Sequence, residues 1–373
     1  MSPVRASSKP SAGPVRVALA AGAQTLHRAG RVVQHLTVGL VDEPFGVTLI
    51  TAQNADVSSL PCPPVEVLRY PVPQPWRFRT RVVEPLAEQL AEQNVEVLHA
   101  LDSSAHALVR ALSDELDLPY LLTVWGPGGA RQVAPPGPLC RGVLAVSAQM
   151  RSALLAGLAV PEEMVRVIRP GVHQSAPRCQ TGPVDRNRAI IAAGRFEPAG
   201  PFETVLRAFG LLRQAGYDCV LFLLGDGPAE HRLRQMAGAS GLMHYVTFVD
   251  RLPQPQLPEI FSAADLFVYP HSDGRLELEL LEAMAAGVPA LVGECRVGDF
   301  ALEGQTSLAY QARNPADLAA KLRGLLDDPA AASALADGAR RHLREHHSPA
   351  RMVAAMAELY RAYALSERTI KLA

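Results

Sequence analysis

The amino-acid sequence alternates short apolar runs, typical of buried β-strands, with amphipathic stretches typical of helices. It does so in two successive blocks. This alternation predicts parallel α/β sheets, because a strand that returns parallel to its neighbour needs a crossover, usually a helix. A chain of 373 residues has room for about two such domains. We therefore expect an α/β protein with two parallel sheets, one in each block.

Changes in composition and periodicity mark the boundaries of the blocks. The first residues are rich in Ser, Pro and Ala and lack an apolar stretch, so they predict a disordered leader rather than a signal peptide. A later stretch without periodicity predicts an interdomain linker. The expected parts are a leader at 1–14, a first domain at 15–172, a linker at 173–187, a second domain at 188–346 and a C-terminal helical segment at 347–373.

Periodicity places the individual elements. The expected strands lie at 15–20, 46–51, 95–99, 120–124, 144–147, 165–172, 188–195, 219–224, 245–248, 264–270 and 288–292. The expected helices lie at 30–40, 81–93, 105–116, 150–156, 203–215, 229–239, 255–263, 316–346 and 350–365. Ser147 stands where a helix N-cap is expected.

Composition narrows the class of protein. The net charge is −1, so no basic excess argues for a nucleic-acid partner. Five cysteines, scattered and without C-x-x-C spacing, argue against a zinc site or a disulfide framework and fit reduced thiols in a cytoplasm. No apolar run approaches the roughly 20 residues that span a bilayer. The segment 76–81 interleaves aromatic and basic residues, which is a weak signal for contact with the inner membrane face. A basic loop packed by its own aromatics is the simpler interpretation.

The stretch 273–289 is the strongest functional signal. It predicts a loop that follows a strand and opens a helix, then a stop at Gly287 and a new strand. The first backbone N–H groups of such a helix have no internal partner and favour negative charge, so a phosphorylated ligand can bind there. Glu282 lies about two turns further on, where its carboxylate can accept hydrogen bonds from sugar hydroxyls. A solvated helix residue is the ordinary alternative for a glutamate.

Other candidates follow expected strands. Arg195 stands at the carboxyl edge of the second sheet, where anionic ligands dock in such folds, although a surface ion pair is an alternative role. Gly22 and Gly225 belong to turns after strands, and Gly225 begins the turn Gly-Asp-Gly-Pro. Trp125 is expected to pack or to form a cleft wall. His99 and His271, at strand ends, are catalytic or, more often for such histidines, structural.

Several motifs, taken together and in order, resemble those of the retaining glycosyltransferases of family 4. They are Thr123-Val-Trp-Gly126, Val146-Ser147, Val167-Ile-Arg-Pro-Gly-Val172, Gly194-Arg195, Gly225-Asp-Gly-Pro228, Asp265-Leu-Phe-Val-Tyr-Pro270 and Leu280-Leu-Glu-Ala-Met-Ala-Ala-Gly-Val-Pro289.

The resemblance implies the GT-B fold. Two Rossmann-like domains then face each other across a cleft, the second holds a nucleotide-sugar, and a C-terminal helix packs back on the first. No cofactor or metal is implied, because cationic side chains and helix dipoles stabilise the leaving nucleotide.

The resemblance also implies site residues. Arg195 matches the arginine that binds the diphosphate, and Glu282 matches the second glutamate of a Glu-x7-Glu motif, which binds the ribose hydroxyls. The N–H groups of Leu276, Glu277 and Leu278 are expected to cradle phosphate or sugar, together with the turn positions Gly22 and Gly225.

Three positions depart from the family pattern. Gly200 stands where a lysine is typical, Gly274 where the first glutamate is typical, and Trp125 where a histidine is common. Asp273, next to Gly274, is our candidate for the missing sugar contact, with Glu277 as an alternative, and Arg275 is the candidate for the missing cation. Each lost charge-assisted contact costs about 1.5–3 kcal/mol, or roughly one to two powers of ten in rate.

The resemblance predicts transfer of a hexosyl group from a UDP-, GDP- or ADP-sugar, with retention, to a glycan, lipid-linked or small-molecule acceptor. The alternative is a non-catalytic relative that acts as a binding or partner subunit, and the three departures motivate it. A GT-B epimerase or phosphorylase is a third interpretation.

Overall fold

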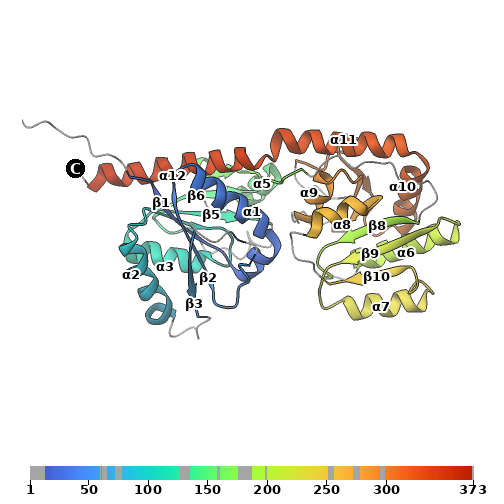
Figure 1. Ribbon diagram of the computed structural model, residues 1–373, viewed down its shortest axis with the longest axis horizontal. Helices are drawn as coiled ribbons and strands as arrows, with labels where there is room; N and C mark the ends of the chain where they lie inside the picture. Colours follow the sequence, from blue (N-terminus) through green and yellow to red (C-terminus); the bar gives the residue numbers. More distant parts are fainter. Residues whose placement is uncertain are drawn as a thin grey trace, which may run out of the picture.

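The computed structural model describes residues 13–58, 60, 65–71, 78–126, 135–157, 160–174, 187–197, 200–250, 256–271, 278–294 and 299–371. Two α/β units lie side by side, and a long C-terminal helix crosses from the second unit to the first (Figure 1). The prediction of an α/β protein with two Rossmann-like units and a returning helix is confirmed.

The N-terminal unit contains a seven-stranded sheet with strand order β3-β2-β1-β4-β5-β6-β7, and every neighbouring pair in it is parallel. Its strands are β1 Arg16–Ala20, β2 Gly46–Ala52, β3 Glu66–Tyr70, β4 Val97–Ala100, β5 Tyr120–Val124, β6 Cys140–Ala145 and β7 Val165–Val167. Its helices are α1 Ala23–Asp42, a π-helical turn Arg79–Val83, α2 Glu84–Glu92, α3 His106–Leu116, α5 Ala148–Gly157 and a 3₁₀ turn Glu162–Met164.

The C-terminal unit contains a six-stranded sheet, again fully parallel, with strand order β10-β9-β8-β11-β12-β13. Its strands are β8 Arg188–Ala193, β9 Cys219–Leu224, β10 Val246–Val249, β11 Leu266–Tyr269, β12 Ala290–Gly293 and β13 Leu308–Tyr310. Its helices are α6 Gly200–Gln214, α7 Glu230–Ala239, α8 Leu257–Ala263, α9 Leu278–Ala285, α10 Pro315–Asp327 and α11 Pro329–His346, after which α12 Pro349–Lys371 begins.

Both faces of each sheet are buried, which explains why the central strands are nearly continuous apolar runs. In β1, Val17 and Leu19 belong to one core cluster, whereas the alternate residues Ala18 and Ala20 belong to another. The strand β8 divides in the same way between two clusters. One cluster is shared: it contains β1 residues from the first sheet and β8 residues from the second, so the apolar cores of the two units are continuous.

The structure corrects several predicted elements. Helix α1 begins at Ala23, seven residues before the predicted start. No side chain caps its N-terminus at Gly22, and non-helical geometry at Ala29 interrupts it, so the sequence marks its beginning weakly. The edge strands β3 and β13 were not predicted, since β3 buries only Leu68 and β13 has just three residues. The region 316–346 forms two helices rather than one. Asp328 caps the second helix through the N–H of Ala331, and Pro329 follows at its first position.

Ser147 caps a helix as predicted, since its hydroxyl accepts a hydrogen bond from the N–H of Met150 at 3.1 Å. The segment 76–81 lies partly outside the described residues. Within it, the Arg79 guanidinium contacts Glu115 at 2.6 Å. No helix in the described part of the chain is long and apolar enough to cross a membrane.

The C-terminal helix α12 packs against α1 and β4 of the first unit. Its Tyr360 is fully buried, and the Tyr360 hydroxyl lies 2.6 Å from Nδ1 of His99, a buried residue of β4. Nε2 of His99 lies 2.8 Å from the hydroxyl of Thr123. Burial lowers the pKa of His99 to about 3, so the imidazole stays neutral near pH 7. His99 is therefore a structural residue that ties α12 to the first sheet.

We predict that Tyr360→Phe destabilises the protein by about 1–3 kcal/mol, because it leaves a buried nitrogen of His99 without its partner. Chemical denaturation followed by circular dichroism measures this change. Tyr363→Phe is the matched control on the same helix: the Tyr363 hydroxyl donates to the carbonyl of Arg141 in a partly buried position where water can replace it, so the loss should be smaller. Equal losses in the two variants would contradict the structural role of His99.

Candidate functional site

The order of the strands in both sheets points to one region of the molecule. In an open parallel sheet, ligands bind beyond the carboxyl ends of the strands, where the strand order reverses direction. The reversal falls between β1 and β4 in the first sheet and between β8 and β11 in the second. Gly22 follows β1, Arg195 follows β8, and the loop before α9 follows β11. The predicted site residues therefore follow the strands at which topology favours binding.

Arg195 is held by two turns that pack backbone against backbone. The N–H of Phe196 donates to the carbonyl of Asp226 at 2.8 Å, and the N–H of Ala229 donates to the carbonyl of Phe196. Gly225 has a φ of +150°, and a Cβ there would overlap the carbonyl oxygen of Gly194. Only glycine therefore fits at Gly225, and its role in the structure is to bring the two turns together.

The Arg195 guanidinium is about one-third exposed, and its Nε donates to the carboxylate of Glu197 at 2.8 Å. The sequence left open a surface ion pair or an anion-binding role for this residue. The ion pair with Glu197 is present, and it holds the guanidinium beyond the carboxyl end of β8. Arg195 as a diphosphate ligand stays a prediction.

Glu282 is not a solvated helix residue, because only 8% of it is exposed. It lies in α9, a helix whose residues 278 and 280–285 are all buried. One carboxylate oxygen, Oε1, lies 3.6 Å from Nη1 of Arg31. The other, Oε2, is buried and accepts no hydrogen bond within the described structure. An unsatisfied carboxylate oxygen is costly in a buried position, and a ligand hydroxyl is the kind of donor that would satisfy it.

Burial raises the pKa of the Glu282 carboxyl to about 7. The Arg31 guanidinium opposes this rise, and the neighbouring carboxylate of Glu279 adds to it. A carboxyl with this pKa is partly protonated at neutral pH, so binding of a ligand that prefers the ionised form depends on pH near neutrality.

Arg31 was not predicted as a site residue. It belongs to α1 of the N-terminal unit, 251 positions away in the sequence from the glutamate that it contacts. No motif surrounds it, and a helical arginine is by default a surface charge. Only the packing of the two units brings it to Glu282, so no pattern in the sequence could have identified it.

The remaining predicted positions divide into two groups. Asp273, Leu276 and Glu277 lie outside the described residues, as do Gly274 and Arg275. Leu278 and Gly22 are described. Leu278 is the first residue of α9 and is buried.

The backbone N–H of Gly22 donates to the Asp102 carboxylate at 2.8 Å, so a group of the protein already uses it. The same carboxylate accepts hydrogen bonds from the N–H groups of Ser104 and Ala105. The described geometry thus gives Gly22 a structural role, and its binding role stays a prediction.

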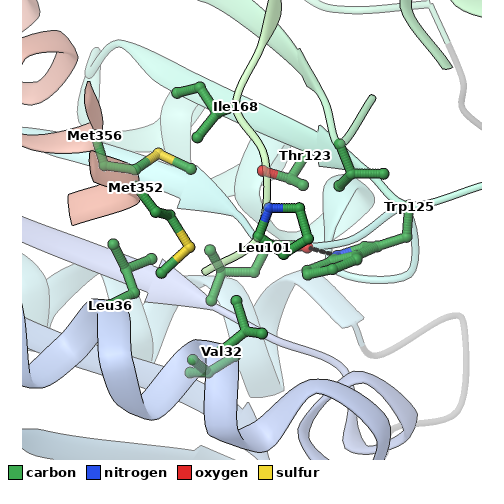
Figure 2. A pocket seen from close by; sticks show the side chains of 11 residues that line it. Val32, Leu36, Leu101, Thr123, Trp125, Ile168, Met352 and Met356 are labelled. Carbon is green, nitrogen blue, oxygen red and sulfur yellow. Dashed lines mark hydrogen bonds between the residues drawn. The ribbon is translucent and has the colours of Figure 1, made fainter. Parts of the chain in front are cut away.

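Trp125 packs rather than standing free. Its indole N–H donates to the carbonyl of Leu101 at 2.7 Å, and its ring borders an apolar cavity of about 30 Å³. Figure 2 shows Val32 and Leu36 of α1 opposite Met352 and Met356 of α12 in this cavity. The volume accommodates a water-sized group and not a sugar ring. His271, the other histidine considered, is buried against the rings of Phe202 and Tyr269.

Two family models match this chain, one for each unit. Residues 29–175 match the model described as Glycosyltransferase Family 4, and residues 187–328 match the model described as Glycosyl transferases group 1.

Curated relatives include a glycogen synthase of Mycobacterium tuberculosis, 28% identical over 73% of this chain and 70% of that protein. A D-inositol 3-phosphate glycosyltransferase of Thermobispora bispora is 31% identical over 49% of this chain and 47% of its own length.

Solved structures share the fold over almost the whole chain. A sucrose-phosphate synthase from Thermosynechococcus elongatus superposes with a TM-score of 0.77 and 20% identity, covering 93% of this chain and 98% of that one. The Anabaena protein HepE in complex with UDP-glucose gives 0.75 and 16% identity, covering 93% and 99%. With both units matched by glycosyltransferase models and the fold shared end to end, the chain is a glycosyltransferase of the GT-B type.

Proposed function

We propose that this enzyme belongs to the family 4 glycosyltransferases and transfers a hexosyl group from a nucleotide-sugar to an acceptor with retention of anomeric configuration. Glu282 binds the ribose hydroxyls of the donor, and Arg195 binds its diphosphate. Asp273 is proposed to contact the transferred sugar. The acceptor is a glycan, a lipid-linked sugar or a small molecule.

The buried carboxylate of Glu282 is the observation that carries this proposal. A ribose offers two adjacent hydroxyl donors, and a carboxylate accepts both. Oε2 of Glu282 is buried without a hydrogen bond in the described structure, although burial of a polar atom is normally compensated. A ribose hydroxyl would supply the donor that this oxygen lacks.

Arg195 supports the second part of the proposal. Breaking the bond between sugar and nucleotide develops negative charge on the diphosphate, and a positioned cation stabilises that charge. The turns of Gly194 and Gly225 fix the backbone on which Arg195 stands, so its charge needs little reorganisation during the reaction. Comparison with known glycosyltransferases favours this enzyme over a non-catalytic partner subunit.

Arg195→Ala and Glu282→Ala should each weaken nucleotide-sugar binding by about ten- to hundredfold, since each removes a charge-assisted contact with the donor. Calorimetry with UDP-, GDP- and ADP-glucose measures this, and UDP-glucose is the first donor to test because the structurally similar HepE was solved with it. Arg188→Ala is a matched control. This residue stands at the opposite end of the same strand, with a side chain 37% exposed against 32% for Arg195. Absence of binding by the wild type would overturn the proposal.

The donor-binding carboxylate should make affinity depend on pH. The carboxyl pKa of Glu282 is raised to about 7, so the protonated form dominates below that pH and the ionised form above it. The ionised form accepts the stronger hydrogen bonds. Affinity for a nucleoside should therefore rise between pH 6 and pH 8 and level off above. A nucleoside is the suitable ligand because it carries the ribose and no phosphate that titrates in this range.

Glu282→Gln removes the titrating group and should give a flat pH profile. The buried histidines His35, His99 and His347 do not interfere, since burial lowers the pKa of each to about 4 or below. A profile that keeps its rise in Glu282→Gln would show that another group is responsible.

Retention is tested by the stereochemistry of the product. The enzyme, supplied with the donor that binds and a panel of acceptors, should form a product with the same anomeric configuration as the donor sugar, in buffer that contains EDTA. Proton NMR of the new glycosidic linkage gives the configuration. Inversion, or a strict requirement for a metal ion, would contradict the mechanism.

A further inference from the structure

A positive charge from the N-terminal unit lies against the carboxylate that is proposed to bind ribose. Nη1 of Arg31 is 3.6 Å from Oε1 of Glu282, and the two side chains are only 20% and 9% exposed. The distance exceeds the range of a hydrogen bond, about 2.7–3.2 Å for N–H···O. The contact is therefore an ion pair without close hydrogen bonding at this atom pair, and hydroxyl donors at hydrogen-bonding distance would satisfy the carboxylate better.

The C-terminal unit offers little positive charge of its own at the described part of this site. Arg195 shares its guanidinium with Glu197. Gly200, at the start of α6, has no side chain, and nothing lies within 4 Å of the position that a Cβ would take there. A nucleoside diphosphate carries at least two negative charges, and such groups bind most tightly where several cations or N–H donors converge.

Helix α1, which carries Arg31, is irregular two residues before that arginine. The backbone of Ala29 departs from helical geometry, with φ −121° and ψ 17°, and divides α1 into two segments. Kinks of this kind are sites at which a helix accommodates a change of direction. Arg31 follows the kink by two residues, so the kink sets the direction of the helical segment that carries it.

We propose that Arg31 is a second diphosphate-binding cation, contributed to the donor site by the N-terminal unit. In the structure its guanidinium contacts Glu282. When the ribose hydroxyls bind Glu282, the guanidinium turns to the adjacent phosphates. This inference rests on the proposed donor-binding role of Glu282.

The exchange satisfies each group in both situations. Glu282 has either the guanidinium or the ribose hydroxyls near its carboxylate, and the phosphate oxygens offer Arg31 a contact in place of the one with this carboxylate. Both partners are anionic oxygens, to which a guanidinium is well matched. The exchange also makes nucleotide binding a bridge between the two units, since Glu282 belongs to one and Arg31 to the other.

The test compares ligands that differ in phosphate content. Calorimetry with a nucleoside diphosphate, the matching monophosphate and the matching nucleoside is performed on the wild type and on Arg31→Ala, with whichever of UDP, GDP and ADP the wild type binds. We expect Arg31→Ala to weaken diphosphate binding by about tenfold or more beyond any change in nucleoside binding, which loss of the guanidinium itself lowers near neutral pH by raising the pKa of Glu282. Arg31→Lys should keep part of the affinity for the diphosphate.

Two controls separate phosphate binding from a structural effect. Arg213→Ala removes an arginine of nearly the same exposure, 21% against 20%, which pairs with Asp218 at the amino end of β9 and should leave all three affinities unchanged. Arg31→Ala in a Glu282→Gln background avoids an unpaired buried carboxylate. The loss specific to the diphosphate should persist there.

Equal losses for the diphosphate and the nucleoside, or no loss for either, would overturn the role of Arg31 and leave the proposed function standing. Failure of the wild type to bind any of the three diphosphates would instead overturn the proposed function, and this inference with it. Melting temperatures within a few degrees of the wild type confirm that each variant is folded before its affinities are compared.

Discussion

One apolar core, shared between the two units, determines where their sheets stand relative to each other. It joins β1 and α1 of the first unit to β8, β11 and α9 of the second, and residues of α11 and α12 complete it. Apolar burial of this kind is the dominant favourable term in folding and has no directional preference of its own. Polar contacts fix the relative orientation of the packed elements. Among them are the hydrogen bond between the hydroxyl of Tyr360 and His99 and the ion pair between Arg169 and Asp299.

The shared core has a direct consequence for the chemistry. Neither Glu282 nor Arg31 forms a site by itself: one is a buried carboxylate on a buried helix, and the other is a cation on the opposite unit. The core brings them within 3.6 Å, and the same burial that packs α9 raises the pKa of Glu282. Packing and electrostatics at this position are therefore one phenomenon. A substitution that loosens α9 would change the charge of the carboxylate as well as its place.

Much of the architecture could be predicted from the sequence, because apolar runs and helical periodicity reflect burial directly. The elements with strong signals, such as β5 with five buried residues in succession, lie where the pattern put them. The edge strands β3 and β13 were missed, since β3 buries only Leu68 and β13 has just three residues. The sequence also singled out Glu282 and Arg195, through their positions after expected strands and through motifs that resemble those of family 4, and their binding roles stay predictions. It could not single out Arg31, whose position depends on a contact between residues far apart in the chain.

The place of α12 also has a consequence for how the protein comes to be folded. Helix α12 completes the core of the first unit, and the hydrogen-bond partner of His99, Tyr360, lies 261 positions later in the sequence. During synthesis, domains generally fold from the N-terminus as they emerge. Here the first unit would leave the ribosome with the apolar surface that packs against Met352, Met356 and Leu359 uncovered until α12 has been synthesised. Premature termination shortly before α12 would therefore yield two nearly complete sheets with a persistent exposed apolar groove, a product for chaperones and proteases to recognise.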